Sequence, residues 1–270
     1  MSTVRRLGAY SIEQIRPDVF AIDDDQMESM YLIRGKDKAL LIDTGSNPGP
    51  VMPVVRTLWN GPVELALTHA HFDHMYHCDE FDFVSVGEQD IKAWYKSLWL
   101  VVFLGTVGSG KKAKYYPINS YHPLRTGDTI KLGGKTIRVL EAKGHTPGSL
   151  IYIDDADKCL FIGDAFGWMW MPGCSVLHEY IESLTKLIPE LKPYKDYLVM
   201  DGHRIQNTPK GIALADMPPA YVDAENMREL CSDILTGKIE PIKKEKFFGF
   251  QTAEYEGHDT HIVIRKSKIK

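Results

Sequence analysis

The hydrophobic pattern in the first third of the chain favours β-strands. Short apolar runs bounded by Gly, Pro or Asn predict strands at 31–34, 38–43 and 63–68, with a short helix at 50–59 between the last two. From Glu88 to about Leu104 the apolar residues recur at the spacing of an amphipathic helix. A stretch rich in Gly and Lys follows at 105–114, and we expect the segment from Trp94 to Lys114 to form a lid.

The second half of the chain repeats this order of strands and a helix. Strands are predicted at 136–140, 150–153, 158–162 and 197–200, and a helix through 181–188 should end at Pro189. The repeated order predicts two α/β halves packed face to face. A further helix after Pro218 and Pro219 leads into a β segment at 247–264. We therefore expect a core at 1–210, with the helix and β segment of 211–270 packed on the same domain.

Composition narrows the class of protein. The chain has 270 residues, of which 44% are hydrophobic and 25% charged, as in ordinary globular proteins. A net charge of -4 gives no positive field, which argues against nucleic acid or membrane partners and favours a small-molecule substrate. The longest apolar run, at 98–104, is far shorter than the roughly 20 residues of a membrane span. The N-terminus lacks a signal-peptide pattern, so a cytoplasmic protein with reduced cysteines is expected.

Candidate chemistry is concentrated directly after the strand predicted at 63–68. Here His69, His71, Asp73 and His74 place three imidazoles and a carboxylate within six residues. Imidazole nitrogen and carboxylate oxygen are ligands of zinc and its first-row neighbours, and a turn leaving a strand can direct them at one centre. The alternative is a polar turn with solvated histidines. The crowding favours a metal site.

Three more polar residues lie at the ends of predicted strands. They are His145 in Gly-His-Thr-Pro-Gly-Ser, Asp164 in Phe-Ile-Gly-Asp, and His203 in Asp-Gly-His. With the first cluster and the segment Leu-Ile-Asp-Thr-Gly that contains Asp43, they resemble the motifs of the metallo-β-lactamase superfamily, in order, over about three quarters of the chain. The resemblance implies an α/β protein with a four-layer αβ/βα sandwich.

The same resemblance implies a site for two divalent metal ions, zinc before manganese or iron. Asp73 and His74 are the candidate catalytic residues, and Asp43 would support the histidine loop by hydrogen bonds from outside the ligand set. The implied ligands are His69, His71 and His145 for the first ion, Asp73, His74 and His203 for the second, and Asp164 as the bridge between them.

The function implied is hydrolysis of an ester, thioester, lactone or amide bond of a small molecule by a hydroxide held between the ions. Two alternatives remain open: a mononuclear iron oxidoreductase of the sulfur dioxygenase type, and a phosphodiesterase on the same fold. The sequence departs from the family at Tyr76-His77, where Gly-Gly is usual, and at Arg204, which we expect to be solvated. His77 is expected to be a structural or surface residue. The sequence specifies neither the substrate nor the oligomeric state.

Overall fold

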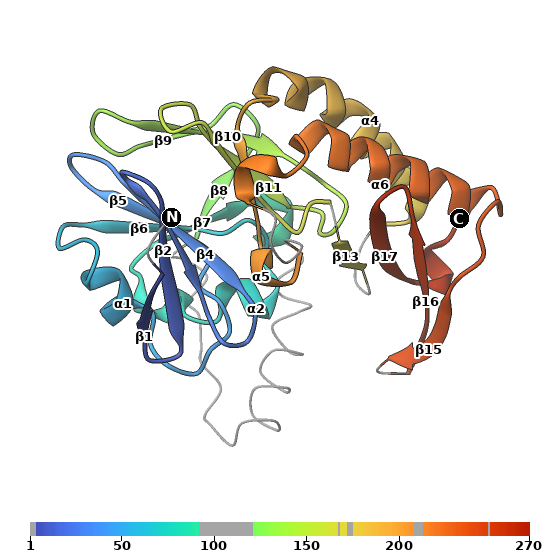
Figure 1. Ribbon diagram of the computed structural model, residues 1–270, viewed down its shortest axis with the longest axis horizontal. Coiled ribbons are helices and arrows are strands. Elements are labelled where there is room, and N and C mark those ends of the chain that lie inside the picture. Colours follow the sequence, from blue (N-terminus) through green and yellow to red (C-terminus); the bar gives the residue numbers. More distant parts are fainter. Residues whose placement is uncertain (1–3, 92–120, 167, 172–174, 208–212, 248) are drawn as a thin grey trace.

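The computed structural model describes residues 4–91, 121–166, 168–171, 175–207, 213–247 and 249–270. Within these ranges the strands form three sheets (Figure 1). The helix predicted from Glu88 begins at that residue and is described as far as Ile91. The rest of that helix, and the lid predicted from Trp94 to Lys114, lie outside the described residues.

Sheet A contains the first eight strands in chain order. Strands β1 to β5 are antiparallel to their neighbours, whereas β5 to β8 run parallel. Parallel strands bring their carboxyl ends to one edge of a sheet, which is where polar site residues gather in α/β proteins. The strands are β1 (Arg5–Leu7), β2 (Tyr10–Arg16), β3 (Val19–Asp23), β4 (Ser29–Arg34), β5 (Ala39–Ile42), β6 (Val63–Ala66), β7 (Val84–Gly87) and β8 (Tyr121–Leu124).

Sheet B has the order β14-β12-β11-β10-β9 and sheet C the order β13-β17-β16-β15. In sheet B, β12 and β14 are parallel, and β10 and β12 are each antiparallel to the β11 between them, so β10, β12 and β14 end at the same edge. The strands are β9 (Thr129–Lys131), β10 (Thr136–Glu141), β11 (Leu150–Asp154), β12 (Cys159–Gly163), β13 (Trp168–Met171), β14 (Leu198–Asp201), β15 (Lys243–Phe247), β16 (Phe250–Gly257) and β17 (Thr260–Arg265).

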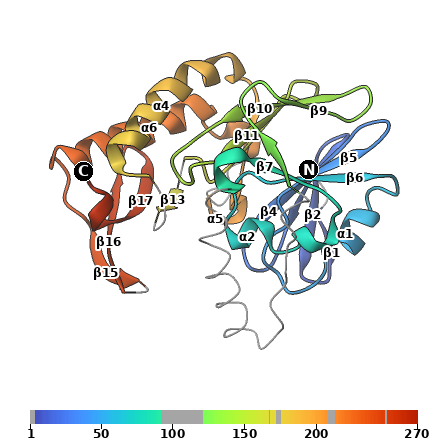
Figure 2. The same cartoon turned by 180° about the vertical axis from the view of Figure 1, so that it is seen from behind.

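Helices cover the outer faces of the two large sheets. On sheet A, α1 (Met52–Arg56) and α2 (Phe72–Met75) join an apolar cluster with strand residues such as Leu41 and Leu65. On sheet B, α4 (Leu177–Leu191) and α6 (Ala220–Leu235) lie side by side (Figure 2) and pack on residues such as Ile151. A short α5 (Arg204–Asn207) follows β14.

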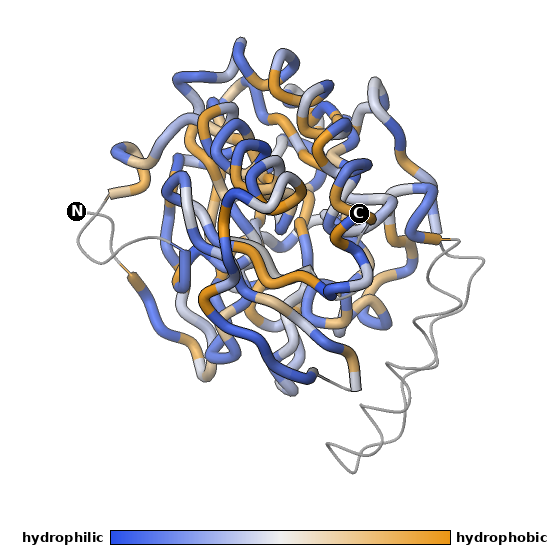
Figure 3. Tube along the Cα trace, turned by 90° about the vertical axis from the view of Figure 1, so that its right-hand side faces the viewer, coloured by the Kyte–Doolittle hydropathy of each residue, from blue (hydrophilic) through white to orange (hydrophobic). Residues whose placement is uncertain are grey.

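A third apolar cluster lies between sheets A and B. It joins Leu40 and Ile42 of sheet A to Tyr152 and Phe161 of sheet B, and all four side chains are buried. Hydrophobic and hydrophilic residues alternate along the helices, as an element with one buried face requires (Figure 3). Strands such as β5 and β11 are instead buried along their whole length, because both faces of their sheets are covered. The layers are therefore helix, sheet, sheet and helix, and the predicted four-layer αβ/βα sandwich is confirmed.

The C-terminal segment shares both a cluster and a sheet with the rest of the chain. Residues of α6, β16 and β17 lie in the same apolar cluster as α4 and sheet B. Strand β13, which precedes position 210, pairs in parallel with β17. These contacts support the expectation that 211–270 pack on the core domain, which stays a prediction. Among the described residues, no helix is long and apolar enough to cross a membrane.

Two details differ from the sequence prediction. Pro189 does not end its helix, since α4 continues to Leu191. A proline near the end of a helix removes a single hydrogen bond, and the buried side chains of Leu187, Ile188 and Leu191 hold the last turn on the core. Strands β1 to β3, β7 to β9, β13 and β15 were not predicted. Several are short and carry polar residues, as in the Thr-Ile-Lys of β9, and pairing with neighbours holds them extended.

Candidate metal centre

The site lies where sheets A and B bring the ends of their strands together. His69, His71, Asp73 and His74 follow β6 and continue into α2, and the other three candidate ligands follow strands of sheet B. His145 follows β10, Asp164 follows β12 and His203 follows β14. All seven side chains predicted as ligands are brought together, from positions as much as 134 residues apart in the chain (69 to 203).

Asp164 lies at the middle of this group. Its Oδ2 is 3.3 Å from Nε2 of His203 and 3.6 Å from Nε2 of both His74 and His145. Asp73 is further out, with its Oδ2 3.8 Å from Nε2 of His203 and 3.9 Å from Nε2 of His74. One carboxylate is therefore central and the other peripheral.

The side chains form three overlapping groups that could each hold a cation. Within each group the candidate ligand atoms lie no more than 4.8 Å from one another. His69 belongs to two groups and His74 to two, so the groups are contiguous. They are His69, His71 and His145; His69, His74 and Asp164; and Asp73, His74 and His203.

Asp43 controls which nitrogen of two histidines faces the centre. It stands at the end of β5 with φ +60° and accepts hydrogen bonds from Thr68 N (2.7 Å), Thr68 Oγ1 (2.7 Å) and His74 Nδ1 (3.0 Å). Because Thr68 Oγ1 donates to Asp43, it accepts from His69 Nδ1, at 3.1 Å. Both imidazoles thereby carry a proton on Nδ1 and direct Nε2 inward.

A turn of the N-terminal half orients the last histidine. His203 Nδ1 donates to the carbonyl oxygen of Met27, at 3.3 Å, which directs its Nε2 toward Asp164. Met27 has φ +83°, a backbone conformation that residues other than glycine rarely adopt. The loop that contains Met27 joins β3 to β4, a hairpin that carried no site prediction.

The three-histidine group is electrically neutral. Burial, with a further contribution from neighbouring rings, holds the pKa of His69 and His145 well below the ordinary value. Burial also lowers the pKa of His71. His145 Nε2 lies 2.9 Å from His71 Nδ1, and Nε2 of His69 has no partner at hydrogen-bond distance within the described ranges. Neutral imidazoles with inward lone pairs are suited to bind a cation.

The carboxylate side of the centre is charged. Burial opposes ionisation, but the adjacent His74 and His203 hold the pKa of Asp164 well below its usual range. Burial likewise opposes a charge on His203, yet Asp164 raises the pKa of that imidazole to about 9. The pKa of His74 is also raised, against burial, by Asp164, Asp73 and Asp43. A divalent cation would therefore release protons from these two rings on binding.

Arg204 is not solvated as the sequence suggested. Its side chain is buried, with Nε 2.8 Å from Asp23 Oδ1 and Nη1 2.8 Å from Glu13 Oε2. The guanidinium is paired because the turn that carries His203 packs against β2 and β3, whose carboxylates face it. His77 is structural, as expected: it is buried, with Nε2 2.7 Å from the carbonyl oxygen of Asn47.

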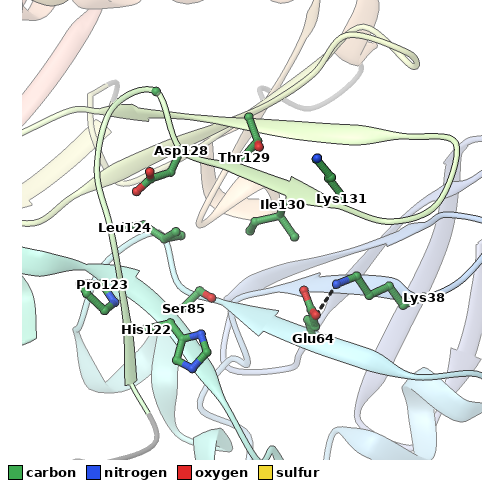
Figure 4. Close-up of a pocket in the computed structure, with 11 residues that line it drawn as sticks. Lys38, Glu64, Ser85, His122, Pro123, Leu124, Asp128, Thr129, Ile130 and Lys131 are labelled. Atoms are coloured by element: carbon green, nitrogen blue, oxygen red, sulfur yellow. Dashed lines mark hydrogen bonds and ion pairs between the residues drawn. The ribbon is translucent and has the colours of Figure 1, made fainter.

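A separate hollow lies at the opposite edge of sheet A, near the amino ends of the parallel strands (Figure 4). Its charges are of both signs, with Lys38 and Lys131 set against Glu64 and Asp128, and Lys38 contacts Glu64 directly. None of the seven predicted ligands lines it. The chemistry is therefore expected at the histidine edge, and not in this hollow.

Comparison with known proteins gives the class of the chain. The family model described as "Metallo-beta-lactamase superfamily" matches residues 23–184. Acyl-coenzyme A thioesterase MBLAC2 of Homo sapiens is 25% identical over 229 residues, covering 72% of this chain and 81% of that protein. Atrochrysone carboxyl ACP thioesterase of Aspergillus fumigatus is 26% identical over 166 residues, covering 60% of this chain and 35% of that protein.

A solved structure is similar in fold. The crystal structure of a β-lactamase domain protein from Burkholderia ambifaria superposes with a TM-score of 0.61 at 18% identity, covering 86% of this chain and 80% of that one. The chain belongs to the metallo-β-lactamase superfamily, because the family model matches more than half of its length. The predictions of this family and of a metal-dependent hydrolase are confirmed.

Proposed function

We propose that the protein hydrolyses acyl thioesters at a centre that binds two divalent ions, zinc by preference. Water and the thioester are consumed, the carbonyl carbon to sulfur bond breaks, and a carboxylic acid and a thiol are released. The observation that carries the proposal is the convergence of three overlapping ligand groups on one strand edge. In this proposal His69, His71 and His145 bind one ion.

The second ion is assigned to Asp73, His74 and His203, with Asp164 between the two ions. The donor set fits a divalent metal. Buried Nε2 atoms of His69 and His74 have no partner at hydrogen-bond distance among the described residues, and such unpaired buried nitrogens are costly unless a cation or a polar group occupies the space between them. A central carboxylate beside neutral imidazoles is the ligand chemistry that zinc accepts, and manganese and iron accept it as well.

The chain's own groups then have separate roles. Bound ions would polarise the substrate carbonyl and lower the pKa of a water molecule, so that hydroxide is available near neutral pH. Asp73 is the more accessible of the two carboxylates, and its Oδ2 can orient the attacking water and hold its proton. Asp43 and Thr68 keep the protons of His69 and His74 on the outer nitrogens.

Thioesters are preferred over the other expected bonds for two reasons. The two relatives named above are thioesterases, one for acyl-coenzyme A and one for an acyl carrier protein substrate. In addition, three of the eight large apolar side chains exposed in the described part of the chain adjoin candidate ligands. Phe72 lies between His71 and Asp73 in the chain, Ile205 is two residues past His203, and the backbone oxygen of Met27 accepts a hydrogen bond from His203. Such side chains suit an acyl chain.

We also propose a cytoplasmic location and a small-molecule substrate. Cys78, Cys159 and Cys231 are buried and lie outside any disulfide bond, as is usual for proteins of a reducing compartment. Acyl-coenzyme A, which the name of the human relative gives as its substrate, is a small-molecule thioester.

The decisive experiment measures metal and activity on the same preparation. Protein purified without chelator should contain about two zinc or manganese ions per chain and should hydrolyse acyl thioesters faster than oxygen esters, lactones or phosphodiesters. Chelation should abolish the activity and zinc should restore it. One iron per chain with consumption of oxygen would instead establish the dioxygenase, and hydrolysis of phosphodiesters alone would establish the phosphodiesterase. Protein without metal would refute all three.

Replacement of Phe72 by alanine tests the acyl surface. The half-exposed ring (50%) adjoins two candidate ligands, so its loss should raise KM for a long-chain acyl thioester by about tenfold, roughly 1.4 kcal/mol of apolar contact. The KM for an acetyl thioester and the metal content should be unchanged. Phe83→Ala is the matched control, because that ring is also exposed but stacks on His122 at the far edge of the sheet. Equal effects of both variants would refute this surface.

A further inference from the structure

Asp90 is a buried carboxylate outside the ligand set. It lies in the first turn of the helix that follows β7 and is 1% exposed. Its Oδ2 accepts hydrogen bonds from Ala70 N (2.9 Å) and Thr146 Oγ1 (2.8 Å), and its Oδ1 accepts one from Gly148 N (2.7 Å). One side chain thus holds three donors from two distant loops.

Both loops carry candidate metal ligands. Ala70 stands between His69 and His71, and Thr146 follows His145. Backbone pairing already joins the loops at one end, where Leu150 N donates to the carbonyl oxygen of Thr68 (2.8 Å). Asp90 joins them at the end next to the histidines. Asp90 therefore links the backbone beside His69 and His71 to the loop that carries His145.

The packing around Asp90 leaves little freedom. A Cβ atom at Gly148 would lie 2.5 Å from Asp90 N and 2.7 Å from its Oδ1. A Cβ atom at Gly87 would lie 1.9 Å from the carbonyl oxygen of Gly148. Gly87 and Gly148 allow the His145 loop to approach the helix closely enough for the N–H of Gly148 to reach the carboxylate of Asp90.

A carboxylate is the group that these donors require. Two backbone N–H groups and one hydroxyl approach it from two directions, and only an ionised carboxyl offers acceptors on both oxygens without a hydrogen of its own. Asparagine would turn an NH2 group toward at least one of the donors, leaving a buried N–H or hydroxyl unpaired. An isosteric amide is therefore a sensitive probe of this contact.

We infer that Asp90 is a positioning residue that locks the loop of His69 and His71 against the loop of His145 and so fixes the geometry of the three-histidine group. The inference rests on the proposed function, because that group is assigned there to a metal ion. It concerns a residue that touches neither metal nor substrate, and its effect is carried by the backbone of the two loops.

The test is metal affinity, measured by competition with a chromophoric chelator, together with the absorption spectrum of the cobalt-substituted protein. Asp90→Asn should lower the affinity for one of the two ions by about 10- to 100-fold. The affinity for the other ion should stay within a few-fold of the wild-type value. The cobalt spectrum should change, because the spectrum reports ligand geometry. These readouts do not require the loaded enzyme to be active.

A second variant covers the case in which Asp90→Asn does not fold. Thr146→Val removes one of the three hydrogen bonds to Asp90 and preserves the side-chain shape. It should therefore lower the affinity for the same ion by about 3- to 10-fold. Thr146→Ser keeps the hydroxyl and should restore affinity to near the wild-type value. A lower metal affinity in Thr146→Val that is restored in Thr146→Ser supports the inference. Equal metal affinities of the two variants contradict it.

Asp154→Asn is the matched control for a purely structural role. Asp154 is also buried, accepts hydrogen bonds from Ala156 N (3.0 Å) and Asp157 N (3.3 Å), and lies outside the three ligand groups. This change should lower the unfolding temperature of the metal-free protein and leave metal affinity unchanged. Wild-type affinity for both ions in Asp90→Asn would overturn the inference alone, whereas a wild-type protein that binds no metal would overturn the proposed function as well.

Discussion

Asp164→Ala is expected to lower metal content and turnover more than Asp73→Ala. Asp164 Oδ2 lies within 3.6 Å of Nε2 atoms of three histidines, whereas Asp73 Oδ2 is at least 3.8 Å from those it approaches. A carboxylate between two ions helps to bind both of them, whereas a peripheral carboxylate helps to bind only one. We expect kcat/KM for an acyl thioester to fall at least about a thousandfold in Asp164→Ala, roughly 4 kcal/mol of transition-state stabilisation.

Metal analysis of both variants, on matched preparations, decides the comparison. Asp73→Ala should keep the ion assigned to the three histidines, while Asp164→Ala should lose most of both ions. Retention of two ions and near-normal hydrolysis in Asp164→Ala would mean that this carboxylate does not bridge them.

Gly202→Ala should disable the centre without removing any ligand. The added Cβ atom would lie 2.2 Å from Asp164 Oδ1 and 2.6 Å from His74 Cε1. His74 is held from behind by Asp43, so it cannot retreat without breaking that hydrogen bond. The central carboxylate must shift instead. We expect kcat/KM to fall at least about a hundredfold, near 3 kcal/mol, and metal content to fall with it.

Gly257→Ala provides the comparison for a general effect of adding a methyl group. At that position in β16 the nearest atom to the added Cβ is Cδ1 of Ile239 at 3.2 Å, the end of a side chain that can rotate. Its metal content and kinetics should match the wild type. Wild-type metal content in Gly202→Ala would show that the turn after β14 is looser than its contacts indicate.

The candidate ligands could be found from the sequence because each follows a strand. An apolar run that ends in a polar turn is a local signal, and the crowding of His69, His71, Asp73 and His74 within six residues does not depend on tertiary contacts. The same holds for the strands of sheet B, whose apolar residues are buried between two packed layers. Local pattern, together with the family resemblance of the motifs, therefore indicated the class of fold and the seven candidate ligands.

The supporting residues gave no such signal. Asp90 stands in an ordinary amphipathic pattern, and Arg204 follows a histidine as a charged residue in a turn commonly does. Their partners are far away in the chain: Thr146 is 56 residues from Asp90, and Asp23 is 181 residues from Arg204. Whether a charged side chain is solvated or paired depends on what packs against it, and one sequence does not state that.

By itself the sequence predicted part of the order of strands and helices and the chemistry of the ligands, because these depend on residue type and short-range periodicity. The class of reaction came from the resemblance of its motifs to those of the metallo-β-lactamase superfamily. The tertiary structure alone decided that Asp43 acts on His69 through Thr68. It also decided that the β3–β4 turn orients His203. The physical reason is that hydrogen bonds and close approaches are set by distances of a few tenths of an ångström, which arise only when both sheets have packed.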